Sequence, residues 1–299
     1  MSKTTLPAPP VPKNDAEGVE RRNRYRDAPR NADYTIDQNW ASYSDKEHDR
    51  WDRLFQRQHK ILATRACEEF TNALTLLRLS EAGIPDMGQL SDRLEAITGW
   101  RVVPVADLVP DDIFFNHLAQ RRFPAGAFIR PESELDYLQE PDVFHDIFGH
   151  VPLLANPVFA DFMQAYGKGG QRAIERDMLK NLARLYWYTV EFGLIRSSTG
   201  LKLFGAGILS SAAESVFALE DPSPHRINFD LKRVMRTNYI IDNFQQSYFV
   251  IDSFQQLLDD CYQDFEAVYD YLETTAAIEP DQTAPGDAIV NLGSLAHFK

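Results

Sequence analysis

The 299-residue sequence predicts a mainly α-helical fold with a few short β-strands. Apolar residues recur at helical spacing in most segments after residue 44, and short β-like runs are few. The hydrophobic content of 44% is enough to bury a large core. No long linker interrupts residues 41–278, so we expect one domain there. It follows a flexible, polar arm over residues 1–40 and precedes a tail over residues 279–299.

Local signals place the expected elements in order along the chain. Ser44 and Glu47 form a capping-box pattern that begins the first helix, Gly99 ends the third, and Pro110 opens the fourth. Ser253, with Gln256 three residues later, begins the last helix. The helices between these are expected over residues 67–79, 89–98, 142–149, 157–166, 173–195 and 211–219. The β-like pieces cover residues 100–105 and 122–130.

Charge and cysteine content narrow the class of protein. The formal charge is −13, from 44 acidic and 31 basic residues, and such a surface repels phosphate backbones and anionic lipids. We therefore expect no nucleic acid and no membrane partner. Two cysteines, Cys67 and Cys261, fit a reducing compartment. With no apolar signal core at the N-terminus, the sequence predicts a cytoplasmic protein.

Two histidines, His145 and His150, lie in a short segment that Pro141 opens and Gly149 interrupts. In a regular α-helix, side chains five residues apart point ~140° away from each other. We therefore expect the helix to break at Gly149, so that His150 turns back toward His145. Zinc proteases instead place two histidines four residues apart with a glutamate after the first, whereas Asp146 follows His145 here.

Glu191 is a lone carboxylate in an otherwise apolar helical stretch, residues 185–194. An unpaired buried carboxylate costs several kcal/mol or raises its pKa by several units, and a divalent cation compensates for it. Two imidazoles and one carboxylate are the usual ligands of non-haem ferrous iron with open coordination positions. Each residue alone also fits a structural role, with Glu191 paired to an arginine such as Arg184. The three together favour a metal site.

Two glycine-rich segments resemble nucleotide-binding loops only weakly. Residues 167–170 lack the full phosphate-loop spacing, so we expect a turn between helices. Residues 205–207 lack the third glycine of a dinucleotide fingerprint, and we expect close backbone approach near a pocket.

Three segments carry a resemblance to a known family. They are residues 141–153, residues 186–193 (Tyr-Trp-Tyr-Thr-Val-Glu-Phe-Gly) and residues 204–211 (Phe-Gly-Ala-Gly-Ile-Leu-Ser-Ser). The sequence resembles the tetrahydropterin-dependent aromatic amino acid hydroxylases, above all the short bacterial phenylalanine 4-monooxygenases, over about residues 44–270. This resemblance implies a basket-like, mostly α catalytic domain and a monomer.

The resemblance also implies an activity and its cofactors. His145, His150 and Glu191 would hold Fe(II), a tetrahydropterin such as tetrahydrobiopterin would bind nearby, and O2 would be the co-substrate. The expected reaction is hydroxylation of L-phenylalanine to L-tyrosine, a step of phenylalanine catabolism. A tyrosine or tryptophan hydroxylase of the same family is the alternative. A zinc hydrolase and a protein with a purely structural metal are the other hypotheses.

Further site residues follow from the resemblance, position by position. The amino acid substrate would contact Arg130, Tyr137, Trp187, Phe192 and Ser210, with Arg130 gripping its carboxylate. The pterin would contact Val109, Phe114, Asp146 and Tyr186. Three positions depart from the animal pattern: Asp146 replaces a glutamate, Leu138 replaces a threonine near the substrate, and Asp107 stands where a glycine is expected.

Overall fold

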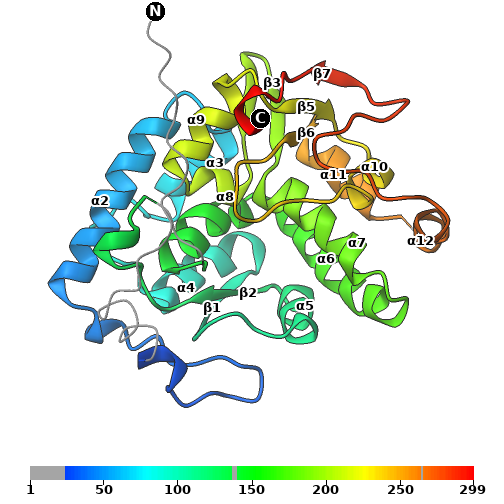
Figure 1. Ribbon diagram of the computed structural model, residues 1–299. Helices are drawn as coiled ribbons and strands as arrows, with labels where there is room; N and C mark the ends of the chain where they lie inside the picture. The colour runs from blue at the N-terminus through cyan, green and yellow to red at the C-terminus, as the bar shows by residue number, and fades with distance from the viewer. Residues whose placement is uncertain (1–23, 137–139, 264) are drawn as a thin grey trace, which may run out of the picture.

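Helices make up most of the computed structural model, which describes residues 24–136, 140–263 and 265–299 (Figure 1). This confirms the predicted mainly α fold. The helices are α2 (Asp45–Leu62), α3 (Glu68–Leu76), α4 (Met87–Thr98), α5 (Asp111–Ala119), α6 (Pro157–Glu175), α7 (Leu179–Tyr186), α8 (Ala206–Leu209), α9 (Ala212–Glu220), α10 (Leu231–Met235), α11 (Phe254–Cys261) and α12 (Glu266–Glu273). Two π-helices, Phe144–His150 and Trp187–Glu191, join this set. Within the described ranges, no helix has both the length and the apolar character needed to cross a bilayer.

The strands form two small sheets. The strands β1 (Arg101–Val105) and β2 (Arg122–Gly126) are parallel, and in Figure 1 they lie beside α4 and α5. The second sheet has the order β4-β3-β6-β5-β7 and mixed direction. Its strands are β3 (Leu194–Ser197), β4 (Gly200–Leu203), β5 (His225–Asn228), β6 (Ser247–Ile251) and β7 (Ile289–Asn291). The sequence did not predict this sheet, because its strands are only three to five residues long.

Several predicted helix boundaries are confirmed. The Ser44 side chain accepts a hydrogen bond from the Glu47 N–H, and the Glu47 carboxylate accepts one from the Ser44 N–H, which is the predicted capping box. Gly99 ends α4 in the left-handed conformation, with a φ of 76°. Pro110 directly precedes α5, as its position predicts.

The glycine-rich segment at residues 167–170 lies inside α6, so the predicted turn there is wrong. A Cβ on Gly167 would lie 2.4 Å from the Ala119 backbone nitrogen, and one on Gly170 would lie 2.0 Å from the Phe115 ring. These glycines therefore let α6 pack closely against α5.

Both ends of the described chain pack onto the domain. Tyr25 and Ile36 are buried, and the Ile36 N–H donates to the Pro104 carbonyl at 3.0 Å. Residues 24–40, which belong to the segment expected to be a flexible arm, therefore contact distant segments of the chain, and the flexibility of the arm stays a prediction. In the tail, Asp287 forms an ion pair of 2.8 Å with Arg233 of α10, and both side chains are buried. The domain division at residues 41 and 278 stays a prediction.

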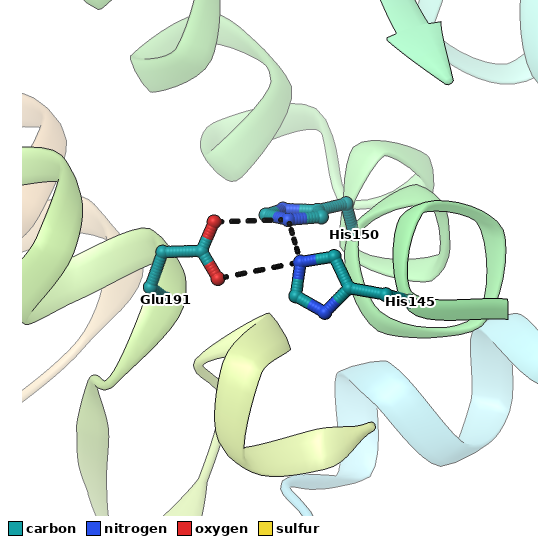
Figure 2. A group of neighbouring side chains, drawn as sticks. All are labelled: His145, His150 and Glu191. Carbon is teal, nitrogen blue, oxygen red and sulfur yellow. Dashed lines mark hydrogen bonds and ion pairs between the residues drawn. The ribbon is translucent and has the colours of Figure 1, made fainter. Parts of the chain in front are cut away.

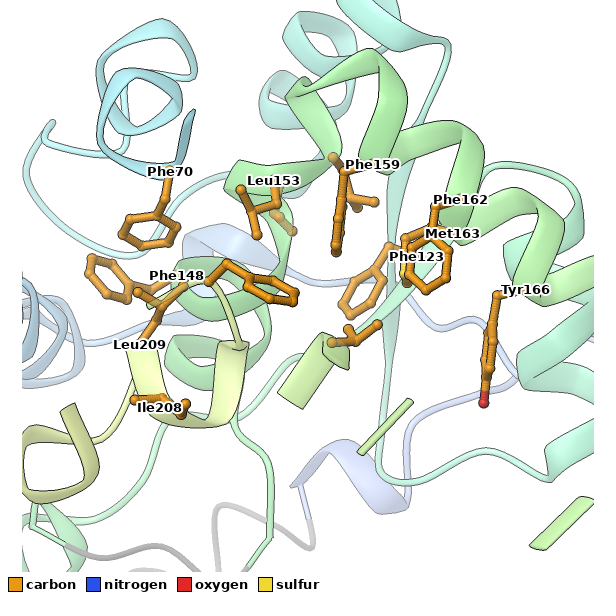
Figure 3. Close-up of a cluster of buried hydrophobic side chains, with 14 of the residues drawn as sticks. Phe70, Phe123, Phe148, Leu153, Phe159, Phe162, Met163, Tyr166, Ile208 and Leu209 are labelled. Carbon is orange, nitrogen blue, oxygen red and sulfur yellow. The ribbon is translucent and has the colours of Figure 1, made fainter. Parts of the chain in front are cut away.

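The first π-helix is anchored in an aromatic core (Figure 3). Phe144 and Phe148 lie on this helix and stack with ring centroids 4.8 Å apart. Trp51 of α2 packs edge-on against Phe144, and Phe70 of α3 packs edge-on against Phe148. All four side chains are almost fully buried. Because buried rings of this size prevent the π-helix from rotating about its axis, the face of the helix that does not carry them keeps one direction.

Candidate metal centre

His145 and His150 lie on one face of a π-helix. The structure shows no helix break at Gly149; instead, residues 144–150 form a continuous π-helix, so that prediction is wrong. In a π-helix each N–H bonds to the carbonyl five residues earlier, so side chains five apart lie above one another. The wider helix thus brings His150 to the same side as His145, which the predicted break was expected to do. The chain does not have to turn back.

Gly149 has a different role from the one predicted. A Cβ at this position would lie 2.9 Å from the Ala206 carbonyl oxygen and 3.1 Å from the Ala206 Cβ. The glycine therefore allows α8 to pack directly against the π-helix. This close approach places Ser210, which follows α8, within 2.9 Å of the His145 Nδ1 atom.

We expect Gly149→Ala to destabilise the protein by about 1–3 kcal/mol, because the new methyl group must push α8 away. Gly169→Ala is the matched control: Gly169 lies inside α6, and its Cβ would have no neighbour within 4 Å. Alanine there is expected to be neutral or to stabilise by up to about 1 kcal/mol. Urea denaturation of both variants gives the comparison. Equal stability of Gly149→Ala and the wild type would contradict the packing role.

Glu191 closes the group from the second π-helix, Trp187–Glu191 (Figure 2). Its Oε1 lies 3.2 Å from the His150 Nε2, its Oε2 lies 3.6 Å from the His145 Nε2, and the two Nε2 atoms are 3.2 Å apart. The three side chains thus direct one nitrogen or oxygen each toward a common point, and all these atoms lie within 4.8 Å of one another. The alternative pairing with Arg184 is wrong, since Arg184 bonds instead to the Met235 carbonyl.

Hydrogen bonding fixes the tautomer of His145. The Ser210 hydroxyl donates its hydrogen to the Ala206 carbonyl at 2.8 Å. Ser210 Oγ must therefore accept from His145, so the imidazole carries its proton on Nδ1. The Nε2 lone pair then points toward His150 and Glu191, which is the arrangement that a metal-binding histidine needs.

The protonation states of His145 and Glu191 also fit a divalent cation. At His150 burial opposes the charged form, but the nearby Glu191 and Asp146 outweigh burial and raise its pKa, so a metal ion would have to displace a proton there. Burial lowers the pKa of His145 to about 4, which keeps this imidazole neutral. Burial opposes the charged form of Glu191 as well, but the nearby His150 and His145 outweigh it, and the pKa of Glu191 is lowered. A neutral imidazole and an ionised carboxylate are the forms that bind Fe(II). The donor set present in this chain therefore fits the predicted ion.

Two cavities meet at this group of three side chains. The larger has a volume of about 440 Å³ and the smaller about 260 Å³, and His145 and Glu191 line both. The larger cavity contains the predicted substrate residues Arg130, Trp187, Phe192 and Ser210. The smaller contains the predicted pterin residues Val109, Phe114, Asp146 and Tyr186. Tyr137 and Leu138 lie outside the described residues.

Another cavity, of about 870 Å³, is larger than either of these. It lies between α6, α7, α11 and α12 and includes none of the predicted site residues. Volume alone is therefore a poor guide to the site in this protein, whereas the converging ligand atoms identify it.

The smaller cavity is lined by aromatic rings and by several acids, of which Asp146 directly follows His145 in the chain. Phe114 and Tyr186 meet edge to face with centroids 5.8 Å apart. Asp146 Oδ2 accepts a hydrogen bond from the Gly126 N–H at 2.7 Å. Burial raises the pKa of Asp146 to about 7. A flat, polar heterocycle would find here one ring to stack on and one acid to bond.

Arg130 is held by an acid of the protein itself. Its Nε and Nη2 donate to the two carboxylate oxygens of Asp142 at 2.9 and 2.8 Å. Asp142 also accepts the backbone N–H groups of Arg130 and His145. The Nε–Nη2 edge of the guanidinium is therefore used internally and is not available to a substrate carboxylate. The guanidinium keeps Nη1 for a ligand in the larger cavity.

Sequence reasoning missed one polar residue that lines the larger cavity and one that holds a ring of its wall. Glu214, on α9, is 6% exposed and lines the cavity wall. Gln245 accepts a hydrogen bond from the Trp187 indole at 2.8 Å and so orients that ring, which lies 4.7 Å from Phe192. Glu214 follows two alanines and precedes Ser-Val-Phe. A lone acid in an apolar helix is the signal that revealed Glu191, and it could have revealed Glu214.

The fold and the site together define a candidate mononuclear metal centre, at which two histidines and one carboxylate could hold one ion beside two cavities. Residues 10–274 match the family described as biopterin-dependent aromatic amino acid hydroxylase. The chain belongs to this family, which confirms the resemblance seen in its motifs.

Two of the named relatives are bacterial proteins that match over most of their length. Phenylalanine-4-hydroxylase of Caulobacter vibrioides is 58% identical over 265 residues, which are 89% of this chain and 90% of that protein. Phenylalanine-4-hydroxylase of Chromobacterium violaceum is 52% identical over 261 residues, 87% of this chain and 88% of that one. A crystal structure of phenylalanine hydroxylase from Chromobacterium violaceum bound to cobalt is 50% identical and superposes with a TM-score of 0.88. It covers 90% of this chain and 97% of that one.

Proposed function

We propose that this protein is an iron- and tetrahydropterin-dependent monooxygenase that hydroxylates L-phenylalanine to L-tyrosine with O2. The observation that carries the proposal is the meeting of two cavities at His145 and Glu191. One ion held there by three side chains keeps coordination positions that both cavities can reach. The names of relatives 52–58% identical over most of the chain support phenylalanine as the substrate.

His145, His150 and Glu191 would hold the iron, and the iron with the pterin supplies the electrons and the site for activating O2. Ser210 keeps the Nδ1 proton on His145 and so keeps its Nε2 free for the metal. The two π-helices carry all three ligands on elements fixed in the core, which limits their movement during turnover.

The remaining residues would position the two organic molecules. In the larger cavity, Arg130 Nη1 would bind the substrate carboxylate, and Trp187 and Phe192 would enclose its ring. In the smaller cavity, Phe114 would stack on the pterin and Asp146 would bond to it, either directly or through a water. Enclosure of both molecules would exclude bulk water from the metal. We also propose a monomer that acts in the cytoplasm.

An aerobic assay tests the proposal. The purified protein receives Fe(II) and a tetrahydropterin, and L-phenylalanine, L-tyrosine and L-tryptophan are supplied separately. We expect tyrosine from phenylalanine, formed only when iron, pterin and O2 are all present. Hydroxylation of tyrosine or tryptophan alone would instead support the alternative substrates within the family. Full activity with zinc and no pterin would contradict the proposal.

A further inference from the structure

Glu214 is a buried carboxylate that the proposed function does not use. It is the third residue of α9, where a glutamate often caps the helix by returning to the N-cap residue. Its side chain instead accepts hydrogen bonds from the Tyr248 hydroxyl and from the Gln245 N–H at 3.3 Å. The acid therefore faces β6 and the loop before it, at the wall of the larger cavity.

The two carboxylate oxygens of Glu214 are used unequally. Within the described part of the chain, this carboxylate accepts two hydrogen bonds, and Oε1 is the acceptor of both. Its donors are an uncharged hydroxyl and an uncharged amide, so neither supplies positive charge. A buried carboxylate without a cation is costly, and the cost is removed when a ligand provides the charge. Oε2 is the atom that such a ligand would meet.

The other acids on this cavity wall are in a different situation. Asp136 pairs with Arg57 at 2.6 Å and is largely exposed. Asp242 is exposed on the loop before β6. Glu191 faces the two imidazoles. Glu140 is exposed as well. Among the acids that the structure describes on this wall, Glu214 is thus the buried one that faces neither an arginine nor the metal ligands, while Arg130 offers Nη1 to the same cavity.

From this arrangement we infer that Glu214 binds the α-ammonium group of the amino acid substrate through Oε2, while Arg130 binds its carboxylate. An α-amino acid is a zwitterion, so a site with one buried anion and one buried cation complements both of its charges. The inference rests on the proposed function for the identity of the substrate, and it adds the residue that selects an amino acid over an aromatic acid without an amino group.

The matched ligands for the test are L-phenylalanine and 3-phenylpropanoate, which differ only in the ammonium group. Calorimetry on the iron-loaded protein measures the Kd of each without turnover. A charge-assisted hydrogen bond predicts that the wild type binds phenylalanine about 10- to 100-fold more tightly. The Glu214→Gln variant keeps the size of the side chain and the Oε1 acceptor. Its affinity for phenylalanine should fall to its affinity for 3-phenylpropanoate. The affinity for 3-phenylpropanoate should hardly change.

Two variants serve as controls. Asp242→Asn removes an exposed acid from the same wall, and Tyr248→Phe removes a neutral hydrogen bond to Glu214 while keeping its charge. Both should keep most of the preference for phenylalanine. If Glu214→Gln does not fold, Glu214→Asp, which withdraws the carboxylate by one methylene group, should reduce the same preference.

The inference is overturned if the wild type binds the two ligands equally, or if the folded Glu214 variant keeps the full preference. These outcomes are separate from failure of the proposed function. A protein that prefers phenylalanine in calorimetry but forms no tyrosine would contradict the hydroxylase proposal and leave the ammonium contact supported.

The pH dependence gives an independent readout. Burial raises the pKa of Glu214 to about 7 in the free protein. The group that faces it from β6, the Tyr248 hydroxyl, stays protonated because burial raises its pKa well above 10. Only ionised Glu214 pairs with an ammonium group, so the Kd of phenylalanine should rise as the pH falls from 8 to 6. Glu214→Gln should lose the part of this dependence that is specific to phenylalanine and absent with 3-phenylpropanoate.

Discussion

Replacing Glu191 with alanine is expected to abolish hydroxylation and to lower the affinity for iron by more than about 100-fold. Loss of a residue that only orients a ligand already costs about 10- to 100-fold in metal affinity, and Glu191 is a proposed ligand itself. It also supplies the negative charge of the group, without which two neutral imidazoles 3.2 Å apart would have to hold a divalent cation alone. Metal analysis after dialysis against Fe(II) measures the first effect, and the tyrosine assay measures the second.

Folding must be checked separately for this variant. Glu191 lies at the end of a π-helix whose neighbours Tyr188, Thr189 and Val190 are buried, so the backbone should stay in place. Circular dichroism and the urea midpoint should therefore remain close to those of the wild type. Glu175→Ala, on the exposed side of α6, is the matched control and should keep iron and activity. Normal turnover in a folded Glu191→Ala protein would refute the ligand assignment.

The ligands could be predicted from the sequence because their signals are local. It is unusual to find two histidines in a short segment with a glycine. It is also unusual to find one acid in an apolar stretch. The geometry that unites them is not local. The five-residue spacing fits a π-helix, and in the structure α2 and α3 pack against Phe144 and Phe148 of this helix while Gly149 admits α8. Those contacts join residues far apart in the chain.

The sheet was missed for a related reason. The strand β3 follows the second π-helix after two residues, and its Leu194 and Ile195 continue the same apolar run. Periodicity could not separate strand from helix over so short a segment. The direction of Arg130 was equally hidden. Its residue type indicated a carboxylate partner, but only the fold shows that Asp142 occupies the Nε–Nη2 edge.

Asp142→Ala is expected to lower the free energy of unfolding by about 3–5 kcal/mol, because it leaves the buried Arg130 guanidinium without its partner. Asp142 is 0% exposed and Arg130 is 5% exposed, so water cannot replace the lost contacts. The two backbone N–H groups that Asp142 accepts, from Arg130 and His145, lose their acceptor as well. Chemical denaturation measures the change. Asp252→Ala, which breaks the exposed pair with Arg196, should cost no more than about 1 kcal/mol.

The position of Asp142 means that its loss should also affect the metal centre. Its Oδ1 accepts the His145 N–H, and its carboxylate aims the Arg130 guanidinium into the larger cavity. Asp142→Asn separates the two effects, since the amide keeps an acceptor oxygen but not the charge. The asparagine variant should hold iron while binding phenylalanine more weakly, because Arg130 is no longer fixed. If Asp142→Ala were as stable as the wild type, the Arg130–Asp142 pair would have no part in holding the first π-helix to the strand segment after β2.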